Sequence, residues 1–194
     1  KMLISALNSG ADCYMTDFED SLTPNFDNLI QGQLNIKDAI NKKIDFTDQE
    51  SGKEYKLNEK TAVLIIRPRG LHLDEKNVTI DNKRISGTFF DLGLSLFHNA
   101  KKLMENGSGP YFYLPKLEHY LECRLLNDVI TFCEKKLNLK IGMVKVTVLI
   151  ETINAVFQMN EFLWELKDHI VGLNAGRWDY LFSYQKVYRN TKMV

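Results

Sequence analysis

The apolar run at residues 144–150 places the strongest constraint on what this chain can fold into. The run is rich in β-branched residues and stops at a charged residue, Glu151. Such a run is typical of a short strand buried on both faces of a parallel sheet. Apolar residues then recur at helical spacing over residues 153–167, and a second short apolar run follows at residues 170–173. The segment therefore predicts a parallel strand–helix–strand unit.

Two carboxylates, Glu151 and Asp179, follow the two strands of this unit. Because neighbouring parallel strands end at the same edge of a sheet and lie about 4.8 Å apart, we expect both carboxylates at that edge. They would repel each other unless a cation lay between them, and Mg²⁺ prefers oxygen ligands of this kind. A simpler alternative is that Glu151 caps the next helix while Asp179 pairs with Arg177 at the surface.

The rest of the chain repeats the same alternation of strand and helix. Short apolar strands are predicted at residues 11–16, 62–66 and 111–114, helices at 26–42, 89–104 and 119–137, and hairpins at 44–60 and 78–85. This pattern predicts an α/β fold with a parallel sheet. Five strand–helix units are visible in the sequence, whereas a closed (β/α)8 TIM barrel needs eight. We therefore predict part of a TIM barrel with two hairpin excursions. An open doubly wound sheet is the alternative, although no Gly-x-Gly-x-x-Gly fingerprint follows any strand.

Each predicted strand ends on charged residues, and a parallel sheet gathers such ends at one edge. Besides Glu151 and Asp179, these residues are Asp17, Glu19, Asp20, Arg67, Lys116 and Glu118. This edge is where folds of this class carry their chemistry, so the sequence predicts a polar site there.

The composition argues against several classes of partner. The 25 basic and 25 acidic residues cancel, so nothing favours nucleic acid or an anionic membrane surface as a partner. The longest apolar run is too short to span a bilayer. Cys13, Cys123 and Cys133 lack metal-ligand spacing and predict reduced thiols in an intracellular protein. No secretory signal is visible, and because the sequence begins on Lys1 in mid-pattern, we expect further residues upstream.

Six stretches of the sequence, in order along nearly the whole chain, resemble the A-type malate synthases. They are Leu7-Asn8-Ser9-Gly10-Ala11, Asp17-Phe18-Glu19-Asp20, Arg67-Pro68-Arg69-Gly70-Leu71-His72-Leu73, Phe112-Tyr113-Leu114-Pro115-Lys116-Leu117-Glu118, Leu149-Ile150-Glu151-Thr152-Ile153 and Gly172-Leu173-Asn174-Ala175-Gly176-Arg177-Trp178-Asp179-Tyr180. The resemblance implies a TIM-barrel enzyme of the glyoxylate cycle that condenses acetyl-CoA with glyoxylate and hydrolyses the thioester to give malate and CoA.

The resemblance also implies a cofactor and its ligands. Glu151 and Asp179 match the Mg²⁺ ligands of the family, and the ion would chelate glyoxylate and polarise its carbonyl. Asp17, Glu19 and Asp20 match an acidic motif that would hydrogen-bond the water molecules of the metal.

Further residue roles follow from the same resemblance. Arg67 matches the catalytic arginine of the family. Since a guanidinium is always charged, we expect it to stabilise the enolate oxygen of acetyl-CoA and the incoming glyoxylate. A salt bridge from Arg67 to Asp17 or Glu19 is the structural alternative, and both roles can hold at once. Backbone N–H groups around Trp178 and Asp179 would bind the glyoxylate carboxylate, with Gly176 allowing close approach.

The family's general base is an aspartate in a separate C-terminal region, which the 194 residues do not reach. We therefore expect residues 1–194 to be an incomplete barrel domain that binds its ligands with little or no turnover. Two alternatives remain: a citrate-lyase-like carbon–carbon lyase, and a non-catalytic remnant of a malate synthase. The resemblance implies a peroxisomal (glyoxysomal) or cytoplasmic protein that is not secreted, leaves room for a homo-oligomer, and involves neither nucleic acid nor membrane. The last residues, 191–194, are not a peroxisomal tripeptide.

Overall fold

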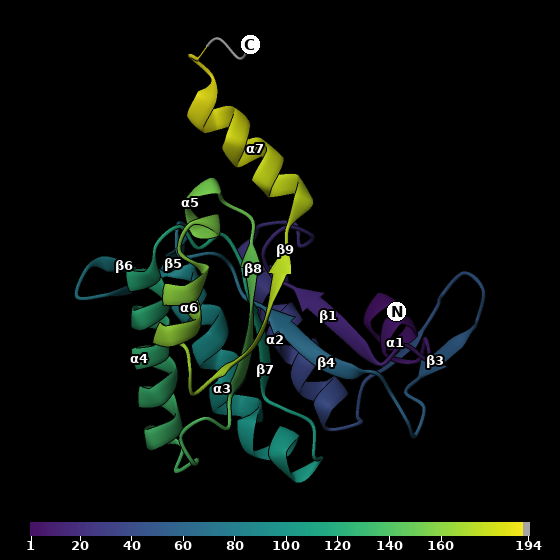
Figure 1. Cartoon of the computed structure of the whole chain (residues 1–194). Coiled ribbons are helices and arrows are strands. Elements are labelled where there is room, and N and C mark those ends of the chain that lie inside the picture. The colour runs from purple at the N-terminus through teal and green to yellow at the C-terminus, as the bar shows by residue number, and fades with distance from the viewer. Residues whose placement is uncertain (192–194) are drawn as a thin grey trace.

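The computed structural model describes residues 1–191 and contains a parallel sheet whose five strands lie in sequence order (Figure 1). The strands are β1 (Cys13–Asp17), β4 (Val63–Arg67), β7 (Tyr111–Leu114), β8 (Lys145–Ile150) and β9 (Ile170–Ala175). A doubly wound sheet would reverse its strand order at a switch point, and these five strands show no reversal. The predicted α/β fold and its parallel sheet are therefore confirmed, and the strand order is that of a barrel wall.

Helices connect successive strands, as a parallel sheet requires. After α1 (Met2–Leu7), these are α2 (Phe26–Ile40), α3 (Gly87–Glu105), α4 (Tyr120–Lys136) and the pair α5 (Ile153–Val156) and α6 (Met159–Glu165). Helix α7 (Arg177–Tyr188) follows β9, the last of the five strands. The two predicted hairpins are confirmed as β2 (Asp45–Thr47) with β3 (Glu54–Lys56), and β5 (Asp74–Ile80) with β6 (Lys83–Ser86). Asp81 and Asn82 both adopt positive φ angles, 51° and 61°, as a tight hairpin turn demands.

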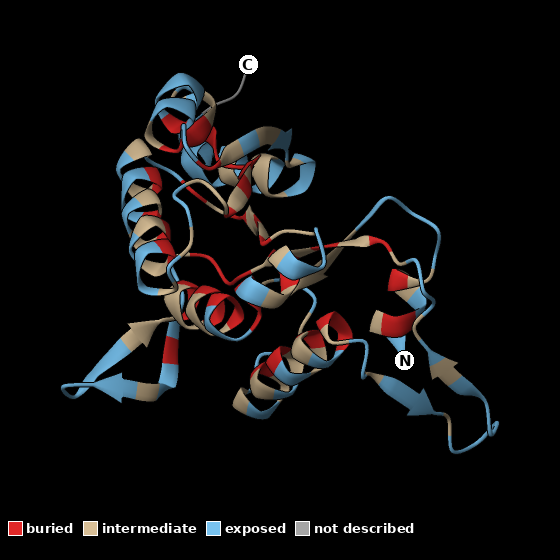
Figure 2. Cartoon of the chain, turned by 90° about the horizontal axis from the view of Figure 1, so that it is seen from below, coloured by how far each residue is buried: buried red, intermediate tan, exposed pale blue. Residues whose placement is uncertain are grey.

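The core lies between one face of the sheet and the helices (Figure 2). Alternate strand residues point into it, so burial in the strands has a period of two. The buried members on this face of β4, β7 and β8 are Leu64, Ile66, Phe112, Leu114, Val146, Val148 and Ile150. The residues between them, such as Ile65, Tyr113 and Thr147, are only half-buried. Among the described residues of these three strands, the second face, which would line the interior of a barrel, is thus open except at Leu149.

The helix predicted at residues 153–167 is instead two short helices, α5 and α6, separated at Phe157 and Gln158. The Gln158 side chain donates hydrogen bonds to the carbonyls of Glu118 and Asn154, both at 3.2 Å, and accepts one from the N–H of Tyr120. Phe157, which contributed to the helical apolar pattern, is 80% exposed. The break is fixed by contacts with the loop before α4, which periodicity does not show.

Helix α7 extends away from the sheet (Figure 1). The structure describes all residues of this helix, and none of them is buried. No helix within residues 1–191 combines the length and apolar character needed to cross a membrane. The interpretation from the sequence that residues 191–194 are not a peroxisomal tripeptide concerns residues 192–194, which lie outside the described part of the chain.

Candidate active site

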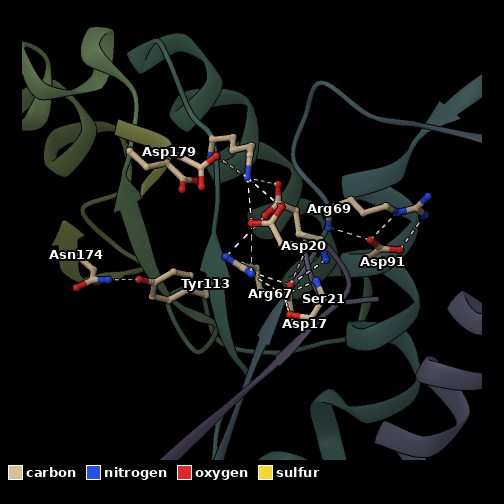
Figure 3. Close-up of polar contacts among 12 residues, drawn as sticks. Asp17, Asp20, Ser21, Arg67, Arg69, Asp91, Tyr113, Asn174 and Asp179 are labelled. Atoms are coloured by element: carbon tan, nitrogen blue, oxygen red, sulfur yellow. Dashed lines mark hydrogen bonds and ion pairs between the residues drawn. The ribbon is translucent and has the colours of Figure 1, made fainter. Parts of the chain in front are cut away.

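The carboxyl edge of the sheet begins with an ion pair between adjacent strands. Asp17 on β1 and Arg67 on β4 are register partners at the last position of each strand, so their side chains start side by side. Arg67 donates from Nε to Asp17 Oδ1 at 2.7 Å and from Nη2 to Oδ2 at 2.5 Å (Figure 3). Burial disfavours the charged Asp17, but hydrogen bonds from Arg67 and Ser21 outweigh it and lower the pKa of Asp17 to about 2. Both members are therefore charged, and the Arg67 fork is held in one orientation.

Glu19 lies beside this pair and is almost fully buried, with 2% of its side chain exposed. Its Oε1 is 2.7 Å from Lys116 Nζ, whereas Oε2 makes no hydrogen bond within residues 1–191 and stands 3.7 Å from Arg67 Nη1. Burial raises the pKa of Glu19 to about 7, although the Lys116 ammonium opposes the shift. An unpartnered buried carboxylate oxygen is costly, so Glu19 Oε2 is an acceptor that a donor at this edge would satisfy.

Lys116, just after β7, joins the two sides of the edge. Its side-chain Nζ lies 3.2 Å from both carboxylate oxygens of Asp20 and 3.3 Å from Asp179 Oδ1. Its backbone N–H donates to Glu151 Oε1 at 2.6 Å. Burial disfavours the ammonium, but the Glu19 carboxylate more than offsets this, so the pKa of Lys116 lies above its ordinary value. From the sequence, Lys116 could be identified only as a charged residue at a strand end, within the Leu-Pro-Lys motif that follows β7.

Glu151 and Asp179 both contact Lys116. Glu151 accepts from its backbone N–H, and Asp179 pairs with its side-chain ammonium. Glu151 follows β8 and is 1% exposed, and burial together with the nearby Asp179 carboxylate raises its pKa to about 7. Asp179 was expected at the end of a strand, after a loop at residues 174–176. Instead, β9 runs to Ala175, and Asp179 lies in the first turn of α7. Neither surface alternative holds, because Thr152 caps α5 and the ion-pair partner of Asp179 is Lys116.

The residues at this edge fit a Mg²⁺ ion by the chemistry of their donors. Within residues 1–191, no group of three or more His, Cys, Asp or Glu side chains could hold a metal. Mg²⁺, however, is usually bound by one or two carboxylates and keeps water molecules or substrate oxygens at its other positions. Glu151 and Asp179 supply two such carboxylates. Burial is the main reason that the pKa of Glu151 is raised, the Asp179 carboxylate raises it further, and a divalent cation would offset both effects.

Gly176 and Trp178 lie between β9 and the start of α7. The N–H of Gly176 donates to the Ile150 carbonyl at 2.8 Å, so this group is already used. A Cβ at Gly176 would stand 2.6 Å from Glu151 Cβ, which means that the glycine allows close approach of Glu151. The N–H groups of Trp178 and Asp179 lie in the first helical turn, where no intrahelical acceptor exists. Trp178 is 70% exposed, and the centroid of its ring lies 4.3 Å from the Arg177 guanidinium carbon.

Tyr113 and Asn174 are polar neighbours of this edge that sequence analysis did not single out. The Asn174 side-chain amide donates to the Tyr113 hydroxyl, joining β7 to β9 across β8 on the open face of the sheet (Figure 3). Only the period-two alternation of the strands could have indicated that Tyr113 faces the same side as Arg67 and Asn174.

Comparison with known proteins gives the same assignment along the whole sequence. The family model described as malate synthase, TIM barrel domain, matches residues 63–194. The chain is 52% identical to malate synthase of Myxococcus xanthus over 194 residues, which is 100% of this chain and 36% of that protein. It is 55% identical over 190 residues to the bifunctional glyoxylate cycle protein of Caenorhabditis elegans, covering 98% of this chain and 20% of that protein. It is 51% identical over 192 residues to glyoxysomal malate synthase of Brassica napus, covering 97% of this chain and 34% of that protein.

The chain thus spans about a third or less of the length of these curated relatives. The resemblance seen in the sequence motifs and the prediction of a partial TIM barrel are both confirmed. With five consecutive parallel strands, a polar carboxyl edge and half of its residues shared with malate synthases, the chain belongs to the malate synthase family and carries part of the TIM-barrel domain.

Proposed function

We propose that the protein carrying this chain is a Mg²⁺-dependent malate synthase, which condenses acetyl-CoA with glyoxylate and water to give malate and CoA. The observation that supports this most directly is the convergence of Arg67, Glu151 and Asp179 at one edge of the sheet, around Lys116 and Glu19. The family match favours this condensation over the reaction of a citrate-lyase-like enzyme.

Glu151 and Asp179 would hold the Mg²⁺ ion. When bound, the ion supplies a Lewis acid that polarises the aldehyde carbonyl of glyoxylate. The N–H groups of Trp178 and Asp179 would bind the glyoxylate carboxylate, because the first turn of a helix offers free donors and the positive end of its dipole. Glu19, Asp20 and Asp17 would orient the surrounding water molecules.

Arg67 would stabilise the negative charge that develops on the thioester oxygen when acetyl-CoA loses a methyl proton. Its Nε and Nη2 are fixed by Asp17, whereas Nη1 makes only the 3.7 Å contact with Glu19 among the described residues. Nη1 is therefore a donor that is already oriented and still available, as stabilisation of a developing charge requires.

The proton itself must be removed by a general base. The family resemblance assigns this role to an aspartate of a further, C-terminal domain. We therefore expect the chain of 194 residues to bind Mg²⁺ and glyoxylate without measurable turnover.

Calorimetric titration of Mg²⁺, with and without glyoxylate, into this chain and into its Asp179→Ala variant tests the proposal. We expect glyoxylate binding that needs both Mg²⁺ and Asp179. Asp168→Ala is the matched control, because Asp168 lies before β9, at the other end of the sheet, where its carbonyl accepts from Lys145. No binding by a chain with native circular dichroism would refute the proposal and favour a non-catalytic remnant.

A kinetic test concerns Arg67 in the full-length protein. Arg67→Lys keeps the charge but cannot form the two-pronged contact with Asp17, so we expect kcat to fall by about 10²–10³. An unchanged kcat would show that the fork has no part in the reaction.

Two of the relatives, from Brassica napus and Cucumis sativus, are named as glyoxysomal malate synthases. We propose the peroxisome or the cytoplasm as the compartment of this protein as well. Fluorescence microscopy of the tagged full-length protein with a peroxisomal marker would distinguish the two, and secretion would contradict both.

A further inference from the structure

One ammonium group, that of Lys116, serves three carboxylates that come from opposite sides of the sheet edge. Glu19 and Asp20 follow β1, and Asp179 lies in α7, after β9. The Nζ distances are 2.7 Å to Glu19, 3.2 Å to both oxygens of Asp20, and 3.3 Å to Asp179. Since β1 and β9 are the outermost strands of the sheet, this side chain is the link between the two ends of the edge.

The backbone of Lys116 contacts a fourth carboxylate, that of Glu151. Its φ angle is 55°, in the left-handed region that glycine adopts more readily than lysine. In this conformation, the N–H donates to Glu151 Oε1 at 2.6 Å while the side chain reaches Glu19 and Asp20. A strained residue persists only where its surroundings hold it, and such residues concentrate at functional sites.

The contacts of the ammonium differ in how easily they can be exchanged. Glu19 is 2% exposed, so its contact with Lys116 is short and shielded from water. The Asp179 side chain is 35% exposed, and its contact is longer, at 3.3 Å. A competing cation could therefore take Asp179 from Lys116 more easily than Glu19, because a solvent-exposed pair loses little when it separates.

We propose that Lys116 is a positioning residue, which acts as the resident cation of the acidic edge and releases Asp179 when a divalent cation binds to Glu151 and Asp179. This rests on the proposed function, in which these two carboxylates hold Mg²⁺. Before the metal arrives, the ammonium offsets the repulsion among the carboxylates and keeps them close together. Afterwards, it remains on Glu19, near enough to the divalent ion for the two cations to repel each other.

Competition of this kind makes an unusual prediction about Mg²⁺ affinity. Lys116→Met keeps the length of the side chain but removes the charge, so we expect the full-length protein to bind Mg²⁺ on the order of tenfold more tightly. Lys116→Arg keeps the charge and can form a bidentate ion pair with Asp179, so we expect Mg²⁺ binding to weaken severalfold. A side chain that served only to build the site would give weaker binding in both variants.

The experiment is calorimetric titration of Mg²⁺ into the full-length protein and its variants, together with thermal unfolding without metal. We expect Lys116→Met to lower the unfolding temperature of the metal-free protein, and added Mg²⁺ to remove that difference. Lys145→Met is the matched control, because the Lys145 ammonium contacts the Asp168 carbonyl at the opposite end of β8. This variant should bind Mg²⁺ as the unsubstituted protein does.

Equal or weaker Mg²⁺ binding by a folded Lys116→Met variant would overturn the inference while leaving the proposed function intact. If that variant does not fold, the comparison of Lys116→Arg with the unsubstituted protein decides, and unchanged or tighter binding by the arginine variant overturns the inference. If Mg²⁺ binding by the unsubstituted protein is absent or does not depend on Asp179, the inference and the proposed function both fall.

Discussion

Gly176→Ala is the most demanding single test of the geometry at the sheet edge. The added Cβ would stand 2.6 Å from Glu151 Cβ and 3.1 Å from Leu149 Cδ1. Carbon atoms normally approach to about 3.5–4.0 Å, so Glu151 would have to move by roughly 1 Å. The backbone of Gly176, with φ −93° and ψ 95°, suits alanine, so the effect comes from lack of space alone.

Neither neighbour can yield easily, because Glu151 is 1% exposed and Leu149 is 6% exposed. Overpacking of this kind costs about 1–3 kcal/mol of stability. A shift of Glu151 would also break its 2.6 Å hydrogen bond with the Lys116 N–H, so we expect Mg²⁺ affinity to fall about tenfold or more.

Urea denaturation and Mg²⁺ calorimetry would measure the two effects of Gly176→Ala. Gly172→Ala is the matched control, because Gly172 lies on β9, four residues before Gly176, and an added Cβ would meet no described atom within 4 Å. If Gly176→Ala were as stable as Gly172→Ala and bound Mg²⁺ equally well, the tight contact with Glu151 would be wrong.

Two further predictions concern buried acids. Glu19 and Glu151 have folded pKa values of about 7 against an ordinary 4.5, so the folded protein holds more protons between these values. The contribution of these two groups to the stability of the metal-free protein should therefore be greatest below pH 4.5 and should fall as the pH rises through 7. Added Mg²⁺ should restore the lost stability at pH 8. Urea denaturation at a series of pH values would measure this trend, and its absence would contradict the prediction. Glu134→Ala would remove the acceptor of the buried Val144 N–H and of the half-buried Gly142 N–H, which donate to Glu134 at 2.8 and 3.0 Å. Each lost acceptor costs about 1–3 kcal/mol, which thermal denaturation would detect, and an unchanged midpoint would refute it.

Most of the fold could be predicted from the sequence because the strands of the parallel sheet are short apolar runs, and β1, β4 and β8 end on or next to a charged residue. The helices and both hairpins followed from apolar spacing and from turn residues such as Asp81 and Asn82. The break between α5 and α6 could not, because Gln158 is held by the loop at Glu118, 40 residues earlier in the chain.

The candidate site was only partly visible in the sequence for a similar reason. The charges of Arg67, Glu151 and Asp179 could be predicted, and so could the places of Arg67 and Glu151 at strand ends, whereas Asp179 lies in α7. The family resemblance supplied their expected roles. The central position of Lys116 could not, because it depends on a left-handed backbone that contacts Glu151, 35 residues later. The fit of Gly176 against Glu151 likewise arises only when β8 and β9 pair.

The order of charges along the chain bears on how the edge assembles during synthesis. The first acids, at residues 17–20, are made before Arg67 and Lys116, and Glu151 and Asp179 come last. Because chains emerge and begin to fold from the N-terminus, β1 can pair with β4 and β7 can add to them before β8 and β9 exist. Both cations are then already in place when the last two carboxylates arrive. The carboxylates of the edge therefore do not all come together before Arg67 and Lys116 are present to balance their charge.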